Sequence, residues 1–524
     1  MSALVAACSS EPSPTAPGPV TPPPPPPPPP PLDTTFTIPP ISREFRGVWI
    51  ATVANLDWPS SGALSATQQQ GELVNLLDRA AALGANAVVF QIRVNGEKLY
   101  RGGQEPWATA LAGRTDVDPG YDPLQFAIDS AHARGLELHA WFNPFRAGNA
   151  SDTARLAPSH FARRRPDLRR VPRDRVTGGG VGLWFDPGEA EVQDYTIGVF
   201  TDVVSRYDLD AVHIDDFFYP YPNANGALVF PDDSTFARYT RGGGTLARAD
   251  WRRDNINRFI ERLYREVHAL KPTLKVGISP FGIWRPGNPA GITGLDAFAD
   301  IFADSRLWLQ RGWVDYFSPQ LYWSIASTGQ SFPALLDWWH AQNTQQRHLW
   351  PGLAAYRVAD GTSSAYAAQE ILSQIGLTRD RATGTRSAGS ILFRAGSVFD
   401  NRQNIFTSLA TGTYAGVALP PASPWLSSTA PGTRPALTAT PVTTPANAWS
   451  VRIVADRVDA LRWWLVRWRS RSATTLAWST RVIPATATTI VVAPSSAGAR
   501  VDGVVVQAVD RAGNTGDAVV WRAP

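Results

Sequence analysis

The sequence predicts an α/β fold, a (β/α)8 TIM-type barrel followed by a small all-β sandwich domain. Eight short apolar runs alternate with stretches of helical period between residues 45 and 397, which fits a β/α barrel with loop insertions. A doubly wound open sheet is the alternative, but no glycine-rich phosphate loop follows the first run to favour it. After residue 436 the pattern changes to β-type alternation without a helical stretch, which predicts the second domain.

We expect one barrel strand in each apolar run and helices between the runs. The runs lie at 45–52, 86–94, 136–145, 209–219, 274–284, 314–323, 349–357 and 390–397. Helical periodicity is clear at 70–83, 123–134, 189–207, 254–270 and 299–311. Gly84 and Gly135 each follow a helical stretch, where glycine favours a C-terminal cap. The barrel domain is therefore predicted to span residues 43–419.

The first residues are typical of an exported bacterial lipoprotein. Small and aliphatic residues precede the single cysteine, Cys8, as in a lipobox whose cysteine is acylated and anchors the chain to a membrane. We interpret residues 1–8 as the remnant of this signal and expect the true start upstream, since a signal peptide also needs a charged start and an apolar centre. Residues 9–42, with an unbroken proline run at 22–31, are predicted to form an extended spacer. The alternative is that Cys8 has no function.

A second linker and a β-rich domain are predicted at the end of the chain. Residues 420–436 are rich in Pro, Ser, Thr and Ala. Within 437–524, strands are predicted at 449–454, 462–468, 488–492 and 503–509. The segment 504–513 is similar to the last strands of a fibronectin type III-like sandwich. We expect this domain to act as a spacer or to bind glycan or protein.

Composition argues against several classes of protein. The formal net charge is +4, there is one cysteine, and no run of about 20 apolar residues predicts a membrane-spanning helix. No Gly-x-Ser-x-Gly elbow is present, so a serine hydrolase is not expected. The arginine-rich stretch at 163–175 is interpreted as a solvated loop, with attraction to an anionic envelope polymer as the alternative. We expect no cofactor, no nucleic-acid partner and a monomer.

Polar side chains gather toward the C-terminal ends of four predicted strands, where β/α barrels carry their active sites. Burying many polar groups is unfavourable unless they bond to one another or to a ligand. Four converging polar faces therefore favour a ligand such as a sugar. Because alternate residues of a strand share a face, the predicted faces are Gln91, Arg93 and Asn95; His139, Trp141 and Asn143; His213 and Asp215; and Tyr316, Ser318, Gln320 and Tyr322.

Asp215 and Asp216 are the acids best placed for glycoside hydrolysis. This reaction normally needs one carboxyl group to protonate the leaving oxygen and a second to attack or to activate water. The alternative role for Asp215 is an ion pair with Arg93 inside the barrel, which would lower its pKa and make it a poor acid. That consideration favours Asp216 as the acid and Asp215 as the base or stabiliser.

Further candidates follow other strands. For the second carboxylate they are Glu97, Glu370, Asp57 and Asp186, although Asp186 also fits a turn and helix cap and Glu370 a solvated helix residue. Rings that could stack on sugars are Trp58, Trp141, Trp284, Tyr322 and Trp323, each of which could instead be a core residue. The predicted substrate-binding set also includes Asp57 and Tyr219.

Two other functions remain open from the residues alone. His139, His213, Asp215 and Asp216 could hold a metal ion, as in a polysaccharide deacetylase, although no paired-histidine spacing of the usual zinc kind is present. The protein could also be an envelope protein that binds glycan without cleaving it.

Six blocks, in order along the chain, resemble the glycosyl hydrolase-like 10 family, the YngK/DigH-like bacterial glycoside hydrolases. They are FRGVWIATVANLDWPS (45–60), YDPLQFAIDSAHARGLELHAWFNPFR (121–146), WFDPGEAEV (184–192), AVHIDDFFYPYP (211–222), VGISPFGIWR (276–285) and VDYFSPQLYWS (314–324).

The resemblance covers about residues 43–400. It implies a TIM-type barrel and hydrolysis of glycans, such as peptidoglycan strands stripped of their stem peptides. It also implies importance for Asp215 and Asp216 without assigning their roles, an acidic residue at Glu97, and no metal. The arginine-rich stretch and the fibronectin-like tail depart from the family pattern and leave the substrate open.

Overall fold

The computed structural model describes residues 36–149, 153–384 and 386–524. The predictions for Cys8 and for the proline run at 22–31 therefore lie outside the described residues. Within the described residues, no helix is both long enough and apolar enough to cross a membrane.

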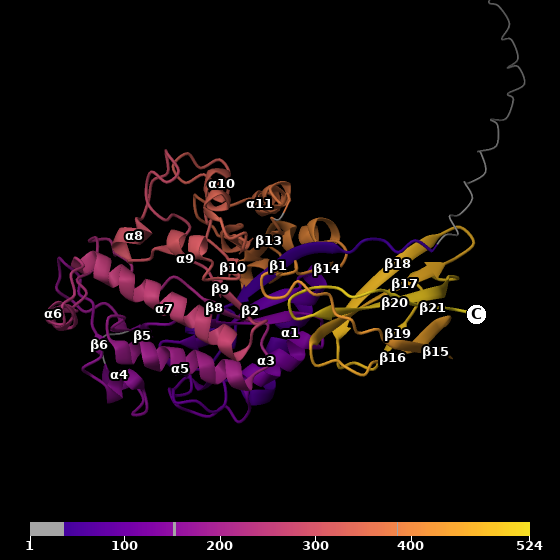
Figure 1. Cartoon of the computed structure of the whole chain (residues 1–524), viewed down its shortest axis with the longest axis horizontal. Helices are drawn as coiled ribbons and strands as arrows, with labels where there is room; N and C mark the ends of the chain where they lie inside the picture. Colours follow the sequence, from indigo (N-terminus) through magenta and orange to yellow (C-terminus); the bar gives the residue numbers. More distant parts are fainter. Residues whose placement is uncertain (1–35, 150–152, 385) are drawn as a thin grey trace, which may run out of the picture.

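The first domain is a parallel β-barrel surrounded by helices (Figure 1). The seventh predicted strand is split in two by Trp350 and Pro351, so that β11 pairs with β10 while β12 pairs with β13. Because β13 also pairs with β1, the sheet closes on itself and the predicted (β/α)8 fold is confirmed. The strands are β1 (Ser42–Ile50), β2 (Ala87–Val94), β4 (Glu137–Phe142), β8 (Ala211–Ile214), β9 (Lys275–Ile278), β10 (Tyr316–Phe317), β11 (His348–Leu349), β12 (Gly352–Leu353) and β13 (Ala388–Leu392).

Helices connect successive strands. They are α1 (Ala66–Leu83), α3 (Pro123–His132), α5 (Ala190–Arg206), α7 (Arg248–Leu270), α9 (Ser305–Arg311), α10 (Phe332–Gln342) and α11 (Ala368–Asp380). Helix α1 begins at a capping box in which Ser65 and Gln68 bond each other's backbone, and it ends at Gly84 with φ of 86°. The helix predicted at 299–311 begins only at Ser305, because Phe302 has φ of 54°, which interrupts a right-handed helix.

Shorter elements lie in the loops. Those between the barrel strands are β3 (Glu97–Lys98), α2 (Thr109–Ala112), β5 (Arg146–Gly148), α4 (Phe161–Arg164), β6 (Arg169–Arg170), β7 (Leu183–Phe185), α6 (Asp233–Arg241) and α8 (Ala297–Asp300). After β13 come α12 (Ala395–Phe399), α13 (Ile405–Ser408) and β14 (Ala418–Leu419). Strand β14 pairs with β1 at the point where the barrel domain ends.

The second domain consists of two antiparallel sheets packed face to face. One sheet has the order β15 (Ala436–Val442), β16 (Ala448–Val454), β19 (Thr489–Val492), and the other has β18 (Leu476–Pro484), β17 (Leu461–Arg471), β20 (Arg500–Asp510), β21 (Val519–Arg522). Val451 and Ile453 of the first sheet share one apolar core with Trp464 and Val506 of the second. The predicted strands correspond to β16, β17, β19 and β20, whereas sequence alternation does not single out β15, β18 and β21. The likeness to fibronectin type III stays a prediction.

The sandwich packs against the end of the barrel at which the strands begin. Arg462 of β17 pairs with Asp210, the residue before β8, at 2.6 Å, and with Asp208 at 3.0 Å. Trp425, in the segment predicted as a linker, donates to Asp315, just before β10, at 2.8 Å. The connecting segment is therefore fixed by contacts, and the opposite end of the barrel is free of the sandwich (Figure 1).

Arg462→Met is expected to lower the free energy of unfolding by about 3–5 kcal/mol, because it leaves the carboxylate of Asp210 buried without its cation. Urea unfolding at pH 7 measures the loss. The matched control, Arg452→Met at an exposed position of β16, should change stability by less than about 0.5 kcal/mol. Adding Asp210→Asn should recover part of the loss; unchanged stability in Arg462→Met would contradict the assigned role of this ion pair.

Candidate active site

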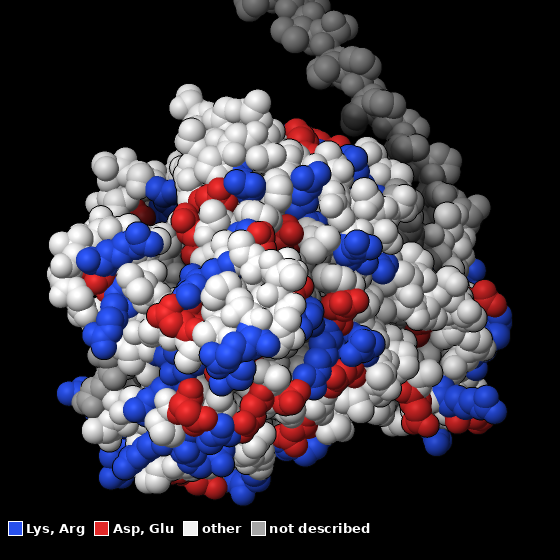
Figure 2. Space-filling model, turned by 60° about the vertical axis from the view of Figure 1, so that its left-hand side comes forward, with Lys and Arg blue, Asp and Glu red and all other residues white. Residues whose placement is uncertain are grey.

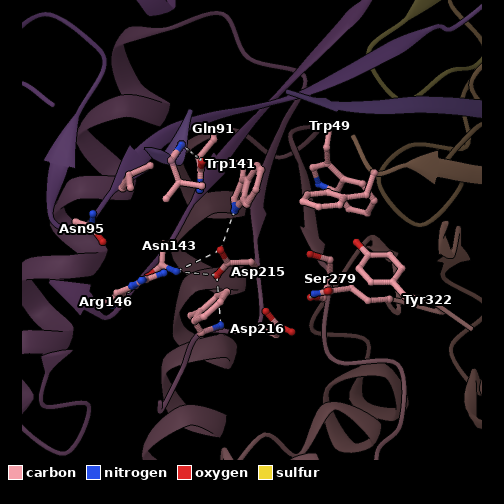
Figure 3. Close-up of a pocket in the computed structure, with 15 residues that line it drawn as sticks. Trp49, Gln91, Asn95, Trp141, Asn143, Arg146, Asp215, Asp216, Ser279 and Tyr322 are labelled. Carbon is pink, nitrogen blue, oxygen red and sulfur yellow. Dashed lines mark hydrogen bonds between the residues drawn. The ribbon is translucent and has the colours of Figure 1, made fainter. Parts of the chain in front are cut away.

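A pocket of ≈ 230 Å³ lies at the C-terminal ends of the barrel strands, the end that carries active sites in β/α barrels (Figure 3). Its lining residues are Trp49, Val53, Gln91, Val94, Asn95, Trp141, Asn143, Arg146, Asp215, Asp216, Phe217, Ser279, Gln320, Tyr322 and Phe393. A second pocket of ≈ 270 Å³ shares the side chains of Val53, Val94 and Asn95 with it. The two pockets are therefore neighbours in one depression.

Asp215 is held by neutral hydrogen-bond donors from the end of β4 and from its own loop. Trp141 Nε1 donates to Oδ2 at 3.0 Å, and Asn143 Nδ2 lies 3.2 Å from both oxygens. The backbone N–H of Phe217 adds a longer bond of 3.4 Å. These donors fix the carboxyl group in one orientation, visible in Figure 3.

Asp216, the next residue, bonds to different partners. Its carboxyl group accepts a hydrogen bond from the hydroxyl of Tyr221 and one from the side chain of Gln320. Gln320 is itself held in place, because its Nε2 also donates to the carbonyl of Ser279 at 2.9 Å. Asp215 and Asp216 are only 5% and 4% exposed, so both acids sit in a largely dehydrated site.

Burial shifts the titration of both acids toward neutral pH. It raises the pKa of Asp215 to about 7, with a further contribution from the charge of Asp216. It also raises the pKa of Asp216 to about 6, although the hydrogen bond from Tyr221 acts in the opposite direction. Because each charge disfavours the other, the two groups titrate as a pair. Between the two pKa values the pair carries about one proton, so an acid and a carboxylate stand side by side.

Polar residues below the pocket form a hydrogen-bonded chain with a defined direction. Lys275 pairs with Glu137 at 2.9 Å, and this carboxylate accepts from His139 Nε2 at 3.0 Å. Burial lowers the pKa of His139, so its Nδ1 is an acceptor and the hydroxyl of Tyr316 donates to it at 2.9 Å. Tyr316 then accepts from Nδ1 of His213, also at 2.9 Å.

This chain determines what the pocket floor offers a ligand. Burial keeps the pKa of His213 well below its usual value, and its Nε2 accepts from the hydroxyl of Ser279 at 2.9 Å and, more weakly, from the indole N–H of Trp49 at 3.4 Å. Ser279 lines the pocket, and its hydroxyl proton is engaged in the hydrogen bond to His213. Its oxygen can therefore only accept a hydrogen bond from a ligand. His139 and His213 lie in the barrel interior beneath the pocket and do not line it.

Eight residues that the sequence predicts for the site or for its polar faces line the pocket, namely Gln91, Asn95, Trp141, Asn143, Asp215, Asp216, Gln320 and Tyr322. Sequence patterns alone do not single out Trp49, Arg146, Phe217, Ser279 and Phe393. Trp49, Arg146 and Ser279 lie in or just after strands whose sequence blocks are recognisable, but strand alternation does not identify Arg146, because it lies beyond the end of β4.

The alternative for Asp215, an ion pair with Arg93, is not formed in the structure. Arg93 pairs with Glu105 at 2.6 Å, and both side chains are fully buried. The pairing of β2 with β4 shifts register between Gln91 and Arg93. Such a bulge breaks strict alternation, so Gln91 lines the pocket while Arg93 does not.

Four other predicted binding residues serve the scaffold and do not line the pocket. Asp57 pairs with Arg394 at 2.6 Å, and Trp58, fully buried, donates to a backbone carbonyl of α1 at 2.8 Å. Tyr219 is 1% exposed, in an aromatic cluster. Trp323 packs edge-on against Phe281. Each lies near a strand end, as predicted, but its side chain turns into packing contacts.

The candidates for a distant second carboxylate are also engaged elsewhere. Glu97 lies in the neighbouring pocket and accepts from the backbone of Thr109 at 2.8 Å and the hydroxyl of Thr115 at 2.9 Å. Glu370 accepts from the backbone N–H of Ile325 at 2.7 Å and so orders the loop after β10. Asp186 pairs with Arg170 at 2.7 Å and bonds the turn before α5, as its cap pattern predicts. None of the three lines the pocket that holds the aspartate pair.

The predicted metal alternative requires two histidines and two aspartates to converge. Instead, the ring nitrogens of His139 and His213 are taken up by Tyr316, Glu137 and Ser279 below the pocket. In the part of the chain that the structure describes, no group of three or more His, Cys, Asp or Glu residues is arranged to hold a metal ion.

The arginines at 163–175 are largely used in local contacts. Arg165 pairs with Asp167 at 2.7 Å, and Arg169 donates to the carbonyl of Ala162 at 2.8 Å. In Figure 2 the side of the molecule with α4, α6 and β6 is turned forward, and basic and acidic side chains are intermingled on it.

Fold and site together define a β/α-barrel protein with a pocket at the strand ends that holds two buried aspartates. The sequence profile of the family described as "Glycosyl hydrolase-like 10" matches residues 44–368. The chain belongs to the glycosyl hydrolase-like 10 family, as the six sequence blocks predict.

Two relatives are similar over most of the barrel. The chain is 39% identical over 397 residues to "Glycosyl hydrolase YngK" of Bacillus subtilis (strain 168), covering 74% of this chain and 75% of the relative. It is 34% identical over 333 residues to "Glycosyl hydrolase DigH" of Escherichia coli (strain K12), covering 61% of this chain and 75% of the relative. Among solved structures, an α-L-fucosidase isoenzyme 2 from Paenibacillus thiaminolyticus has a TM-score of 0.44 at 13% identity, covering 71% of this chain and 49% of that one.

Asp215→Asn is expected to stabilise the protein at alkaline pH. The folded pKa of Asp215 is raised from 3.8 to about 7, so the wild-type protein loses stability as pH rises through this interval. Asparagine cannot ionise, and the variant should exceed the wild type by about 1–3 kcal/mol at pH 8, an advantage that disappears at pH 4. Urea unfolding at both pH values tests this. Lower stability of the variant at pH 8 would show that the carboxylate is not held there at a cost.

Proposed function

We propose that the protein is an exported glycoside hydrolase that cleaves the glycan strands of peptidoglycan by carboxylate acid/base chemistry. The observation that carries the proposal is the pocket at the mouth of the barrel. Its two buried acids share about one proton, and the rings of Trp49, Trp141 and Tyr322 line the same pocket. Aromatic rings can stack on a sugar, and an acid next to a carboxylate can protonate its glycosidic oxygen.

Asp216 is the proposed acid and Asp215 the carboxylate that stabilises developing positive charge. The ground for this assignment is the number of donors. Asp215 accepts from Trp141, Asn143 and the backbone of Phe217, which favours its anionic form. The raised pKa of Asp215 favours the opposite order. We give the donors greater weight, because the pair shares its proton and a ligand that donates to Asp215 moves that proton to Asp216.

Arg146 supports an anionic glycan as the substrate. It lines the pocket and forms no ion pair with an acid of the described residues, and its buried Nε has no hydrogen-bond partner among them. The guanidinium lies 5.3 Å from the ring of Phe217, which orients it. Asn95, at the boundary of the two pockets, has a buried side-chain oxygen that is also unpaired. Unpaired buried polar groups are unfavourable unless a ligand completes them.

The proposed location is the cell envelope, with a lipid on Cys8 as the anchor. The described chain begins beside the sandwich, where the ring of Phe36 contacts Arg522 at 3.3 Å and Trp478 at 5.1 Å. The pocket is at the opposite end of the barrel. An anchor that enters beside the sandwich would therefore direct the pocket away from the membrane, toward a polymer outside it.

Asp216→Asn is expected to fold and to release reducing ends from peptide-free peptidoglycan strands about 100- to 10,000-fold more slowly than wild type, because the leaving oxygen loses its proton donor. Product release is followed by reducing-end assay and mass spectrometry. Asp233→Asn, at an exposed position of α6, is the matched control and should keep the wild-type rate. Wild-type protein that binds strands without releasing reducing ends would establish a glycan-binding protein instead.

Arg146→Gln is expected to raise KM for strands with free carboxylates by about 10- to 100-fold, the value of one charge-assisted hydrogen bond. It should leave KM unchanged for strands whose carboxylates have been converted to methyl amides. The exposed Arg265 of α7 provides the control, since Arg265→Gln removes the same charge far from the pocket. Equal effects of Arg146→Gln on both substrates would assign Arg146 to positioning Asp215.

A further inference from the structure

The two acids of the pocket are consecutive residues, which restricts how they can act together. Both follow β8 directly, and among the described residues they are the only acids that line the pocket. Asp215 is turned toward the donors at the end of β4, and Asp216 toward Tyr221 and Gln320. Figure 3 shows both side chains projecting from the same stretch of chain.

Hydrolysis with two protein carboxyl groups needs them on either side of the scissile bond, about 5–5.5 Å or 6.5–9.5 Å apart with the sugar between them. Both acids of the described lining come from one short segment after β8, and no acid of another strand lines this pocket with them. The rest of the lining offers aromatic rings, amides and hydroxyls, with Trp49 and Tyr322 each packed against Phe393 at 5.8 Å. The described lining therefore offers no acid from another strand as the attacking group.

We propose that the substrate supplies the attacking group, the 2-acetamido substituent of the sugar whose glycosidic bond is broken. The proposal rests on the proposed glycoside hydrolysis and defines its substrate class as a 2-acetamido glycoside. Asp215 accepts the amide N–H of the substituent, and Asp216 carries the proton for the leaving oxygen.

The surroundings of Asp215 fit this role. An amide N–H needs an immobile anionic acceptor, and Trp141 and Asn143 hold the carboxylate of Asp215 at 3.0 and 3.2 Å where it lines the pocket. Trp141 and Trp49, 7% and 2% exposed, supply apolar surface for the methyl group of the substituent. Hydrogen bonding from the amide keeps Asp215 ionised, which leaves the shared proton on Asp216.

The reaction balances with water as the only co-reactant. Asp216 gives its proton to the glycosidic oxygen as the C1–O bond breaks, and the acetamido carbonyl oxygen forms a bond to C1, producing a five-membered oxazolinium ring. The leaving sugar departs as an alcohol. Water then bonds to C1 and gives a proton to the carboxylate of Asp216, while the bond from the acetamido oxygen to C1 breaks. Two inversions at C1 give a product with retained configuration.

The first test changes only the nucleophilicity of the substrate. Peptide-free glycan strands are N-deacetylated and then re-acylated with acetyl, fluoroacetyl or trifluoroacetyl groups, because fluorine withdraws electrons from the carbonyl oxygen. We expect kcat/KM to fall along the series, by at least about 100-fold for the trifluoroacetyl strands, and NMR of the product to show retention at C1. A flat series or an inverted product overturns the proposal.

The second test measures binding and does not depend on turnover. An N-acetylglucosamine thiazoline mimics the oxazolinium ring and should bind the wild-type protein in calorimetry. Asp215→Asn should bind it at least about 100-fold more weakly, whereas Asp233→Asn, at an exposed position of α6, should bind it as wild type does. Absence of thiazoline binding to the wild type, or equal binding by Asp215→Asn, overturns the proposal.

The two tests separate this proposal from the one on which it rests. Strands cleaved at the same rate across the acyl series leave the hydrolase function standing and remove the acetamido mechanism. If no strand of any kind is cleaved, the hydrolase function fails, and thiazoline binding that depends on Asp215 still supports a site for 2-acetamido sugars.

Discussion

The structure depends on how each buried carboxylate is compensated. In the barrel interior and around it, acids are paired with cations: Glu137 with Lys275, Asp210 with Arg462, and Glu105 with Arg93. A buried charge without such a partner is strongly unfavourable. Asp215 and Asp216 differ from these three acids, because their partners are neutral donors. They are the acids whose pKa values rise to about 7 and about 6, which keeps a proton available near neutral pH.

The need to pair a buried carboxylate with a cation also joins the two domains. The carboxylate of Asp210 lies where β8 begins and receives its cation from the sandwich, through Arg462. Trp425 and Arg511 add bonds to Asp315 and Asp208 at the same end. The sandwich thus completes the electrostatics of the barrel floor, and in doing so it leaves the strand ends that form the pocket uncovered.

Inside the barrel, a chain of hydrogen bonds runs from the floor to the pocket and determines which atom donates and which accepts at each step. The carboxylate of Glu137 makes Nε2 of His139 a donor, and the direction of each following bond through Tyr316 and His213 is then determined. The result at the pocket is a Ser279 hydroxyl that can only accept. Several residues that strand alternation marks as site candidates belong to this chain, and their contribution is to support the pocket from below.

The sequence by itself determined the fold class, the positions of the barrel strands and most of the helices, because the alternation of apolar runs with helical periods records burial locally. It also identified Asp215, Asp216, Trp141 and Asn143, which lie on regular strand ends where alternation holds. Only the tertiary structure decided the partners. A register shift turned Arg93 away from Asp215, and packing buried Trp58 and Tyr219. Arg146 entered the pocket from the short strand β5, whose three residues show no recognisable period. Which side chains meet depends on contacts between segments far apart in the chain, and local patterns do not encode those contacts.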